Sequence, residues 1–372
     1  MRVLVLGAGL TGCTLARLMK NKDYLVSIKE KQNHIGGLCY TKTSPIGVLY
    51  EPWGGHVFHT KDTRIKNFVL QFSDFNNYIH RKGIFINDIL RHFPISQETI
   101  LEMEKSEQIL KEIEERPEIP DLTNFETYAI SQFGITLYKL FIYNYSKKMW
   151  DLEPRELTTE YIRNRIEMKN SNTQIFDDNF QGLPVKGYTE FLRNMIGDIP
   201  IELNTSEYDE SIYDLILYSG RIDELFHFKF GNLQFRSLRF DYKENENWEN
   251  EHYGSINLPQ HPKYIRKVNF NVLYQQKTDR SWIQYQEPIA FSDHNLPMYP
   301  IYTKQNIELF NQYLIEVCKS DKIIPVGRLG LYKYLEMGQA IDLAMKMIPL
   351  IENWQKLRPK DRYSEIIKLL NN

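Results

Sequence analysis

Three glycines near the N-terminus have the residue type and spacing of a dinucleotide-binding turn. They read Gly7-x-Gly9-x-x-Gly12, directly after the apolar run at residues 3–6. Gly7 permits a tight turn, Gly9 lets the backbone approach a pyrophosphate, and Gly12 allows close packing of the following helix, whose N-terminal N–H groups attract phosphate. Glu30 follows 21 residues after Gly9 and is placed to bind a ribose hydroxyl. The alternative is a glycine-rich turn without a ligand, but the strand and helix on either side favour the dinucleotide.

Two histidines and three cysteines are the residues that could hold a metal ion. His56 and His59 stand three residues apart, but no carboxylate or thiolate near them completes a ligand set. The cysteines are far apart and lack CxxC spacing, which argues against a thiolate metal site and a disulfide framework and fits a reducing compartment. They are Cys13, Cys39 and Cys318. We therefore expect no metal.

The elements that must position the glycine turn form a βαβ unit. Apolar runs at residues 3–6 and 25–28 predict two strands, and residues 13–20 between them predict a helix. Strand-like runs return much later, at residues 213–218 and 323–327. A doubly wound parallel sheet assembled from discontinuous pieces accounts for this order.

Two further segments differ in character and look inserted. Residues 97–169 are charged and helix-rich. Residues 233–302 change to β-branched and aromatic runs, such as 264–274 and 282–285, which predict an antiparallel sheet. The predicted fold class is α/β: a discontinuous Rossmann-like domain with an inserted helical domain and an inserted antiparallel β-sheet domain. The predicted boundaries are 1–75, 186–230 and 310–372 for the Rossmann-like domain, 95–170 for the helical domain, and 76–94 with 231–309 for the sheet domain.

The composition narrows the class of protein. The 372 residues are 42% hydrophobic and 25% charged, which excludes disordered and low-complexity classes. Lys and Arg number 46 against 48 Asp and Glu, which is too balanced for binding nucleic acid or an anionic membrane through bulk charge. There is no apolar run of about 18 residues, and no signal-peptide pattern follows Met1. We expect a cytoplasmic protein without nucleic-acid or membrane partners.

The continuation after Glu30 distinguishes two kinds of dinucleotide. His34-Ile35-Gly36-Gly37 adds a second glycine pair just past the acidic residue. This pattern resembles the FAD-binding superfamily of glutathione reductase and the amine oxidases, in which an extended FAD lies across the first domain. The resemblance favours FAD over NAD, so the Rossmann-like domain is expected to be an FAD-binding domain.

Several segments, in the same order along the chain, resemble the UDP-galactopyranose mutase family. They are Gly55-His56-Val57-Phe58-His59-Thr60, Tyr145-Ser146-Lys147-Lys148-Met149-Trp150, Phe180-Gln181-Gly182-Leu183-Pro184, Gly187-Tyr188-Thr189, Tyr218-Ser219-Gly220 and Val326-Gly327-Arg328-Leu329-Gly330. Each segment is short, but their collinear order over nearly the whole chain argues against chance. The family's architecture, with a Rossmann-like FAD domain, a helical domain and a six-stranded sheet, agrees with the elements predicted above.

The resemblance implies an isomerase, an intramolecular transferase that converts UDP-galactopyranose to UDP-galactofuranose without net redox change. Reduced FAD would attack the anomeric carbon through N5, expel the nucleotide diphosphate and hold the sugar as an N5–sugar adduct while the ring reopens and closes on another hydroxyl. The implied partners are a nucleotide-diphosphate sugar and an external reductant such as NAD(P)H, and a homo-oligomer is left open. The implied pathway is galactofuranose and cell-surface polysaccharide biosynthesis.

The resemblance also assigns cofactor residues. Those expected to contact FAD are Gly7, Gly9, Thr11, Gly12, Glu30, Lys31, Gly36, Gly37, Leu38, His56, Val57, Arg328, Tyr334, Leu335, Glu336 and Met337. His56 would lie beside the isoalloxazine and respond to the flavin redox state. The N-terminus of a helix starting near Gly338 would complete the flavin site.

The catalytic residues that the resemblance implies are Arg165, Arg266 and His56. The two arginines would flank the diphosphate, since a guanidinium suits bidentate phosphate contacts. A surface arginine is the alternative for each. The hydroxyls of Tyr299 and Tyr334 would also reach phosphate.

The remaining implied substrate contacts are His80, Phe141, Tyr145, Trp150 and Arg236. Phe141, Tyr145 and Trp150 would share one side of a helix and flank uracil and sugar, with core packing an equal alternative for Phe141. Arg236 matches a further family arginine near the active site.

Four positions depart from the family's common pattern. Asn172-Thr173-Gln174 stands where many members have Tyr-Asp-Asp, so an expected phosphate-binding tyrosine is missing. Glu336 replaces an aspartate, Leu38 replaces an asparagine, and an expected glutamate is either Glu287 or is replaced by Gln286. These departures affect the sugar more than the reaction. The alternatives are a mutase for dTDP-fucose or UDP-N-acetylgalactosamine, an FAD amine oxidase or desaturase, and a silent sugar-nucleotide binding protein.

Overall fold

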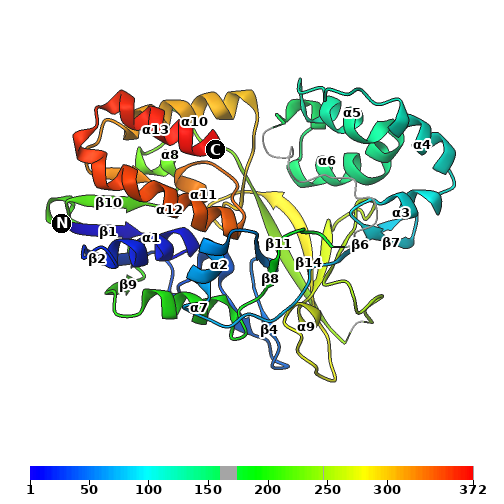
Figure 1. The fold of residues 1–372 in the computed structure, drawn as a ribbon, viewed down its shortest axis with the longest axis horizontal. Coiled ribbons are helices and arrows are strands. Elements are labelled where there is room, and N and C mark those ends of the chain that lie inside the picture. The colour runs from blue at the N-terminus through cyan, green and yellow to red at the C-terminus, as the bar shows by residue number, and fades with distance from the viewer. Residues whose placement is uncertain (160–173, 246, 372) are drawn as a thin grey trace.

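Two sheets organise the computed structural model, which describes residues 1–159, 174–245 and 247–371. One is a five-stranded sheet in the order β16-β10-β1-β2-β9, and the other has seven strands in the order β15-β11-β14-β13-β12-β6-β7. In Figure 1 the five-stranded sheet lies in the left half, and the seven-stranded sheet separates it from helices α3 to α6 at the upper right.

The five-stranded sheet is parallel and joins segments that are far apart in the sequence. Its strands are β1 (Arg2–Leu6), β2 (Leu25–Glu30), β9 (Ile201–Leu203), β10 (Leu215–Tyr218) and β16 (Ile323–Pro325). β1 is central and pairs with β2 and β10. Its residues Val3, Leu4 and Val5 are completely buried, as is typical of parallel strands covered on both faces. The strands predicted at residues 3–6, 25–28, 213–218 and 323–327 are confirmed as β1, β2, β10 and β16, although β10 and β16 are shorter than predicted.

Helices cover this sheet (Figure 1). α1 (Leu10–Lys20) contacts both α7 (Gly187–Ile196) and α12 (Met337–Asn353), while α10 (Lys304–Val317) contacts α8 (Ile222–Leu225) and α13 (Pro359–Asn371). The shorter helices here are α2 (Thr63–Val69) and α11 (Gly327–Gly330), and single 3-10 turns lie at Gly37–Cys39, Glu210–Ile212 and Trp354–Lys356. No helix in the described part of the chain is long and apolar enough to cross a membrane.

The seven-stranded sheet differs in two ways from expectation. Its strands are β6 (Lys82–Ile86), β7 (Ile89–Phe93), β11 (Phe235–Glu244), β12 (Ser255–Asn257), β13 (Arg266–Asn269), β14 (Trp282–Ala290) and β15 (Tyr299–Pro300). The prediction of a purely antiparallel sheet is wrong for one pair, because β12 and β6 are parallel. The sheet has seven strands rather than six because the two-residue β15 pairs with β11.

The strand predicted at residues 264–274 is interrupted. Only Arg266–Asn269 forms a strand, and Phe270–Leu273 form the short helix α9. The side chain of Asn269 accepts the N–H groups of Asn271 and Val272, and this capping contact starts a helical turn. The apolar residues of α9 therefore pack in a helix that their β-like composition concealed.

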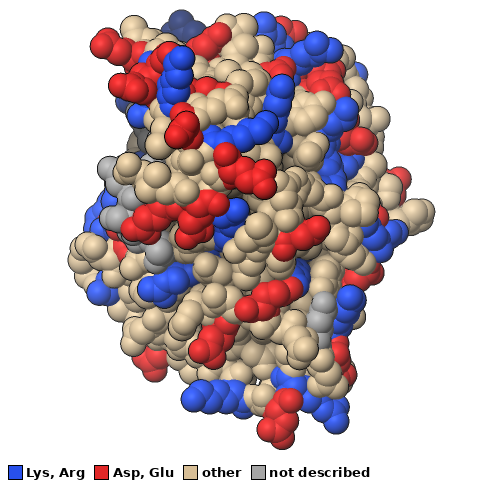
Figure 2. Space-filling view, turned by 90° about the vertical axis from the view of Figure 1, so that its right-hand side faces the viewer, with Lys and Arg blue, Asp and Glu red and all other residues tan. Residues whose placement is uncertain are grey.

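The helix-rich segment contains α3 (Gln97–Leu101), α4 (Ser106–Glu114), α5 (Phe125–Leu137) and α6 (Asn144–Trp150), with a 3-10 turn at Pro154–Glu156. A π-helical turn at Tyr138–Tyr143 separates α5 from α6. Phe141, Tyr145 and Trp150 were expected on one side of a helix; Tyr145 and Trp150 lie on α6, whereas Phe141 lies in the π-helical turn that leads into it. Figure 2, which faces this side of the molecule, shows acidic and basic side chains intermixed on the surface.

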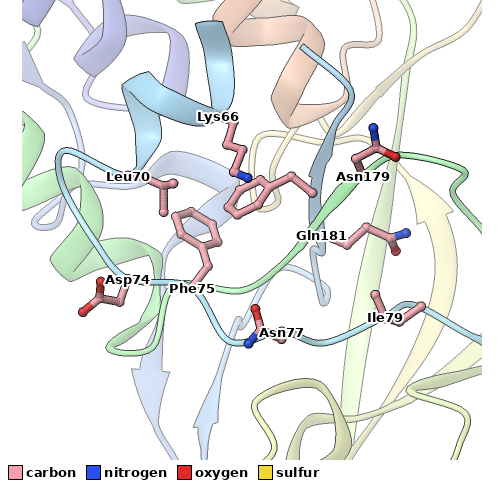
Figure 3. A pocket seen from close by; sticks show the side chains of 9 residues that line it. Lys66, Leu70, Asp74, Phe75, Asn77, Ile79, Asn179 and Gln181 are labelled. Carbon is pink, nitrogen blue, oxygen red and sulfur yellow. The ribbon is translucent and has the colours of Figure 1, made fainter. Parts of the chain in front are cut away.

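Two small sheets complete the fold. β3 (Lys42–Thr43) pairs with β4 (Leu49–Tyr50), and β5 (Phe58–Thr60) pairs with β8 (Phe180–Gly182). An open pocket of about 390 Å³ lies between α2 and β8 (Figure 3). It is lined by Lys66, Leu70, Asp74, Phe75, Asn77, Ile79, Asn179, Phe180 and Gln181. None of these is a predicted site residue, although Gln181 accepts the backbone N–H of His80, a predicted substrate residue.

Candidate active site

The glycine turn lies where β1 ends and α1 begins. Gly7 has φ +108°, and a Cβ there would lie 2.0 Å from Oγ of Ser219, so the turn requires glycine. A Cβ on Gly12 would lie 2.0 Å from the carbonyl oxygen of Gly7, so α1 packs directly on the turn. Gly9 caps α1 without a side-chain hydrogen bond, and the first turn contains no acidic residue. This helix end is therefore suited to an anionic ligand.

Glu30 closes the same corner from the end of β2. It is buried, and its carboxylate accepts the N–H of Ala8 at 2.7 Å and the N–H of Gln32 at 2.8 Å. A Cβ on Gly37 would lie 3.2 Å from Cα of Gly9. The two glycine motifs therefore approach each other so closely that a side chain would obstruct them, as a dinucleotide cradle requires.

The other predicted cofactor residues lie in different surroundings. Thr11 adjoins Gly327, whose Cβ would lie 3.4 Å from the Thr11 side chain. Val57 packs against the core of the parallel-sheet half, whereas Leu38 packs against the core of the helical segment. Lys31 is exposed.

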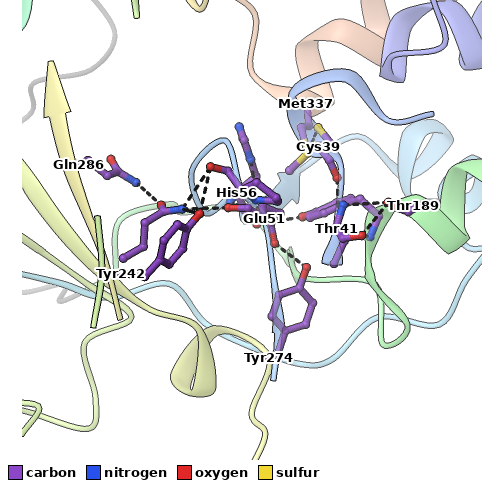
Figure 4. Close-up of polar contacts among 12 residues, drawn as sticks. Cys39, Thr41, Glu51, His56, Thr189, Tyr242, Tyr274, Gln286 and Met337 are labelled. Atoms are coloured by element: carbon purple, nitrogen blue, oxygen red, sulfur yellow. Dashed lines mark hydrogen bonds and ion pairs between the residues drawn. The ribbon is translucent and has the colours of Figure 1, made fainter. Parts of the chain in front are cut away.

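The segment that carries His56 is held by a buried carboxylate, Glu51, which the sequence did not reveal (Figure 4). Glu51 accepts the backbone N–H of His56 at 2.5 Å and the phenolic hydrogen of Tyr274 at 2.5 Å. Nδ1 of His56 lies 3.3 Å from the same carboxylate, and Tyr188 donates to the His56 carbonyl at 3.0 Å. Burial and the charge of Glu51 hold the pKa of Tyr274 well above its usual range, so this phenol remains a donor. The only signal in the sequence is an acid five residues before His56.

Gln286 and Glu287 point to opposite sides of β14. Gln286 donates to the side chain of Gln284 at 3.1 Å, and Gln284 donates to the backbone carbonyl of Glu51 at 3.0 Å (Figure 4). Glu287 instead contacts Arg239 at 2.9 Å. Of the two residues, Gln286 is therefore the one on the side of His56.

Arg266 is the first residue of β13 and contacts the helical segment. Its Nη2 donates to the phenolic oxygen of Tyr145 at 2.8 Å, and its Nε donates to Oδ1 of Asn257 at 3.2 Å. Burial opposes the charged form, but the neighbouring Tyr145 and Tyr299 raise the pKa of Arg266 overall. The guanidinium therefore stays charged beside a group of phenols.

Tyr299 and Tyr334 stack next to Arg266. Their ring centroids are 5.9 Å apart with an interplanar angle of 5°, and the Arg328 guanidinium lies 4.3 Å from the Tyr334 centroid. Arg328 also donates to the carbonyl of Leu335 at 2.8 Å. Burial, followed by the neighbouring Tyr334, raises the pKa of Tyr299 to about 12. Tyr299 is therefore protonated at neutral pH.

Trp150, Phe141 and Arg236 are three of the predicted substrate residues that are buried. Trp150 and Phe141 are each 4% exposed and belong to the core of the helical segment, although Trp150 also meets Tyr299 edge to face at 6.4 Å. Arg236 is buried, and its Nε donates to the carbonyl of Met149 at 2.9 Å. Arg165, together with Asn172 and Thr173, lies outside the described residues.

His59 has partners that sequence proximity did not suggest. Its Nδ1 bonds to Asp178 and its Nε2 lies 3.2 Å from Oε2 of Glu336, while its ring stacks on Phe176 with centroids 3.5 Å apart. Two carboxylates that are distant in the sequence therefore lie beside His59 in the fold. Burial would lower the pKa of His59, but the hydrogen bonds to Asp178 and Glu336 outweigh it and raise the pKa. The described residues contain no cluster suited to a metal ion.

Glu336 also caps α12. Its side chain accepts an N–H of the first turn, and Gln339 accepts the backbone N–H of Glu336 at 3.0 Å. The helix thus begins at Met337, one residue before the predicted start, and its own carboxylate already occupies part of its N-terminus. Sδ of Met337 lies 3.7 Å from Sγ of Cys39 (Figure 4).

His80 is buried and also contacts Phe176, with ring centroids 5.8 Å apart. Its Nδ1 lies 3.2 Å from the Tyr78 hydroxyl, and its backbone N–H donates to Oε1 of Gln181 at 3.2 Å. Burial, together with the positive charges of Lys82 and Arg266, holds the pKa of His80 well below its usual range. His80 is therefore neutral at physiological pH.

The glycine corner, which comprises Gly7, Gly9, Gly12, Glu30 and Gly37, lies between β1, α1 and β2. Together with the fold it defines a protein with a Rossmann-like dinucleotide-binding domain. Residues 5–72 match the model of the family described as NAD(P)-binding Rossmann-like domain, and residues 140–334 match the model of the family described as UDP-galactopyranose mutase.

Relatives of known name agree over nearly the whole chain. A UDP-galactopyranose mutase of Mycoplasma genitalium is 31% identical over 92% of this chain and 93% of its own length. A dTDP-fucopyranose mutase of Escherichia coli is 28% identical over 94% of this chain and 98% of its own. The crystal structure of a reduced UDP-galactopyranose mutase covers 99% of this chain and 98% of that chain with a TM-score of 0.77 at 14% identity, which shows the same fold. The chain belongs to the UDP-galactopyranose mutase family and is an enzyme, an isomerase.

Proposed function

We propose that this enzyme interconverts UDP-galactopyranose and UDP-galactofuranose with a bound flavin and without net consumption of reductant. The observation that carries the proposal is the cationic cluster around Arg266. The half-buried guanidinium of Arg266, with a phenol at 2.8 Å, adjoins two stacked tyrosines and a second arginine. This combination of donors suits a diphosphate.

The corner between β1 and β2 fits FAD. The uncapped start of α1 suits the pyrophosphate, and Glu30 suits a ribose hydroxyl. Gly9 and Gly37 have no side chains, so a ligand can approach their backbone closely. When bound and reduced, a flavin supplies a nucleophilic nitrogen that can displace a diphosphate from an anomeric carbon. The residues proposed to hold it include His56 and Val57 and the segment from Tyr334 to Met337.

Arg266 would bind the diphosphate and stabilise the negative charge that grows as the diphosphate departs. Arg165 is proposed for the same role. Tyr299, with a pKa of about 12, would donate its phenolic proton to a phosphate oxygen as a hydrogen bond without losing it. Arg328 would hold the Tyr334 ring in place, since it is bonded to carbonyls on both sides, those of Met298 at 3.1 Å and Leu335 at 2.8 Å.

His56 would help to position the flavin and His80 the sugar, and neither would transfer a proton. The backbone of His56 is fixed by Glu51 and Tyr188, which would keep its loop in a constant position at the flavin. His80 is buried and neutral, so it would offer a hydrogen bond to a sugar hydroxyl without adding charge.

We also propose that the chain divides into the three predicted domains: Rossmann-like, helical and β-sheet. The parallel-sheet part would bind FAD, and the seven-stranded sheet and the helical segment would together bind the nucleotide sugar. The contact between Arg266 on β13 and Tyr145 on α6 supports a substrate site that needs both parts.

A mutase acting on dTDP-fucose is the second candidate. The Escherichia coli dTDP-fucopyranose mutase is nearly as similar to this chain as the Mycoplasma enzyme is. Gln286, one of the two positions considered for the family glutamate, lies on the side of β14 that faces Glu51. UDP-N-acetylgalactosamine is a further candidate sugar nucleotide, because the chemistry needs only an anomeric diphosphate.

The test is to mix the purified protein, reduced with dithionite, with UDP-galactofuranose, dTDP-fucofuranose and UDP-N-acetylgalactosaminofuranose in separate reactions, and to resolve the pyranose products by chromatography. We expect the fastest conversion with UDP-galactofuranose and none in the oxidised protein. If dTDP-fucofuranose were converted fastest, the proposed function would change to that of a dTDP-fucose mutase. If the protein consumed oxygen in the presence of amines and isomerised none of these sugar nucleotides, the proposed function would have to change from mutase to oxidase.

A further inference from the structure

Lys148 has an arrangement of contacts that the proposed chemistry does not use. Its ammonium lies 2.9 Å from the carbonyl oxygen of Leu258, 3.2 Å from that of Pro259 and 2.8 Å from that of Tyr264, and it also bonds to the carbonyl oxygen of His261. An ammonium has three N–H donors, so four carbonyls more than saturate it. The loop 258–264 is thus folded around one positive charge.

This loop leads directly into Arg266. The N–H of Leu258 donates to the carbonyl of Ile265 at 2.8 Å, and the N–H of Ile265 donates to the carbonyl of Gln286 at 2.9 Å. These bonds close the loop immediately before β13 begins. A shift of the loop would therefore move the backbone of Arg266.

Lys148 lies on the same helix as Tyr145, whose hydroxyl contacts Arg266. Tyr145 and Lys148 lie three residues apart on α6, a spacing that brings side chains to the same face of a helix. One ammonium therefore connects the helix that carries Tyr145 with the loop that precedes Arg266.

We propose that Lys148 is a positioning residue for diphosphate binding: it fixes the loop 258–264 to α6 and so sets the contact between Tyr145 and Arg266. This inference rests on the proposed function, because it assigns the diphosphate to Arg266. Lys147 provides a matched control, since it is the adjacent lysine but is exposed and pairs with Glu153 at the surface.

The charge state of Lys148 gives a second way to examine the role. Burial lowers the pKa of Lys148 to about 8. Charged groups near the loop are Lys243 and Lys263, and Lys263 is paired with Asp241 and Glu287. The pKa of His261 is lowered by burial and by Lys148, which agrees with its Nδ1 accepting the N–H groups of Lys263 and Tyr264, each at 3.0 Å.

The experiment measures the Kd of UDP and of dTDP for FAD-loaded wild type, Lys148→Met and Lys147→Met by calorimetry at pH 7. We expect Lys148→Met to weaken nucleotide binding by about tenfold to a hundredfold, the scale of one lost hydrogen bond to a charged group, and Lys147→Met to bind like wild type. In wild type, affinity should fall as the pH rises through about 8, the pKa of Lys148. Lys148→Met should lack this decline. Equal affinity of Lys148→Met and wild type would overturn the proposal.

A double-mutant cycle separates positioning from a general loss of structure. Tyr145→Phe should weaken binding in wild type but add little in the Lys148→Met background, because the contact would already be disturbed. Fully additive effects would refute the link through Tyr145. If Lys148→Met does not fold, a wild-type affinity that stays constant from pH 7 to 9.5 would refute the proposal without that variant. Failure of wild type to bind either nucleotide would instead contradict the proposed function.

Discussion

Nη2 of Arg266 lies 2.8 Å from the phenolic oxygen of Tyr145, although the two residues belong to different parts of the fold. Arg266 begins a strand of the seven-stranded sheet, and Tyr145 lies on α6 of the helical segment. The contact brings a half-buried cation to the junction of these parts. It is therefore the feature on which changes in substrate binding should depend most.

Arg266→Ala should lose most of its turnover but keep FAD, because Arg266 lies on β13, hydrogen-bonds to Asn257 and Tyr145 outside the glycine turn, and is assigned to the diphosphate. Removal of one donor to a developing negative charge costs about 2.7–4 kcal/mol, roughly a hundredfold to a thousandfold in rate. Arg266→Lys should recover only part of the activity, since a point charge cannot form a two-pronged contact. Steady-state rates of the reduced enzyme and the FAD-to-protein ratio measure both effects.

Arg165→Ala should behave in the same way, with Lys147→Ala as the control for an exposed charge. Lys147 is exposed and pairs with Glu153. If Arg165→Ala and Arg266→Ala both keep more than about a third of wild-type turnover, well short of the loss expected for an oxyanion donor, the diphosphate site must be placed elsewhere.

Tyr145→Phe should raise KM for the nucleotide sugar. A hydrogen bond to a charged group contributes about 1.5–3 kcal/mol, so the rise should be roughly tenfold to a hundredfold. Tyr143→Phe is the matched control, because the Tyr143 hydroxyl donates to Glu153 at 3.2 Å at the surface end of the same segment. Equal KM values for the two variants would show that the Tyr145 hydroxyl has no special role.

The glycine corner could be predicted from the sequence because its signal is local. A strand, a turn with fixed glycine spacing and a helix follow one another within 20 residues, and the backbone geometry itself requires glycine. The same holds for the parallel strands, whose apolar runs reflect burial on both faces. The strand predicted at 264–274 failed because a single side chain, Asn269, starts a helical turn that composition alone does not reveal.

The contacts of the candidate site could not be predicted in the same way, because they join residues that are distant in the sequence. His59 meets Asp178 and Glu336, and Glu51 meets Tyr274, only after the sheets have formed. A buried acid or histidine in the sequence does not indicate its partner.

Two glycines of the same motif should respond differently to alanine. Gly9 has φ −77° and ψ 179°, which alanine also adopts, and a Cβ there would be 4.0 Å from its nearest neighbour in the chain. Gly9→Ala should therefore fold normally but bind FAD weakly, because the methyl group takes space that the pyrophosphate needs. Gly12→Ala should unfold at a lower temperature, because its Cβ would collide with the Gly7 carbonyl. Normal FAD content in Gly9→Ala would contradict the cradle.

His59 should make stability depend on pH. Its pKa is raised in the folded state by its hydrogen bonds to Asp178 and Glu336, which outweigh burial, whereas an unfolded histidine has a pKa of about 6.5. A raised pKa means that the charged form stabilises the fold. This contribution is fully present below about pH 6.5 and is lost as the pH rises through the higher folded-state pKa.

The measurement is the melting temperature of wild type and His59→Gln between pH 5.5 and 9. The difference between the two should be largest at the acidic end and should narrow as the pH rises, because neutral His59 forms weaker bonds with the two carboxylates. His252→Gln is the control, since His252 is exposed and should shift the melting temperature little at any pH. A difference between wild type and His59→Gln that stays constant over this range would mean that His59 is neutral in the folded protein, and its ion pairs with Asp178 and Glu336 would have to be abandoned.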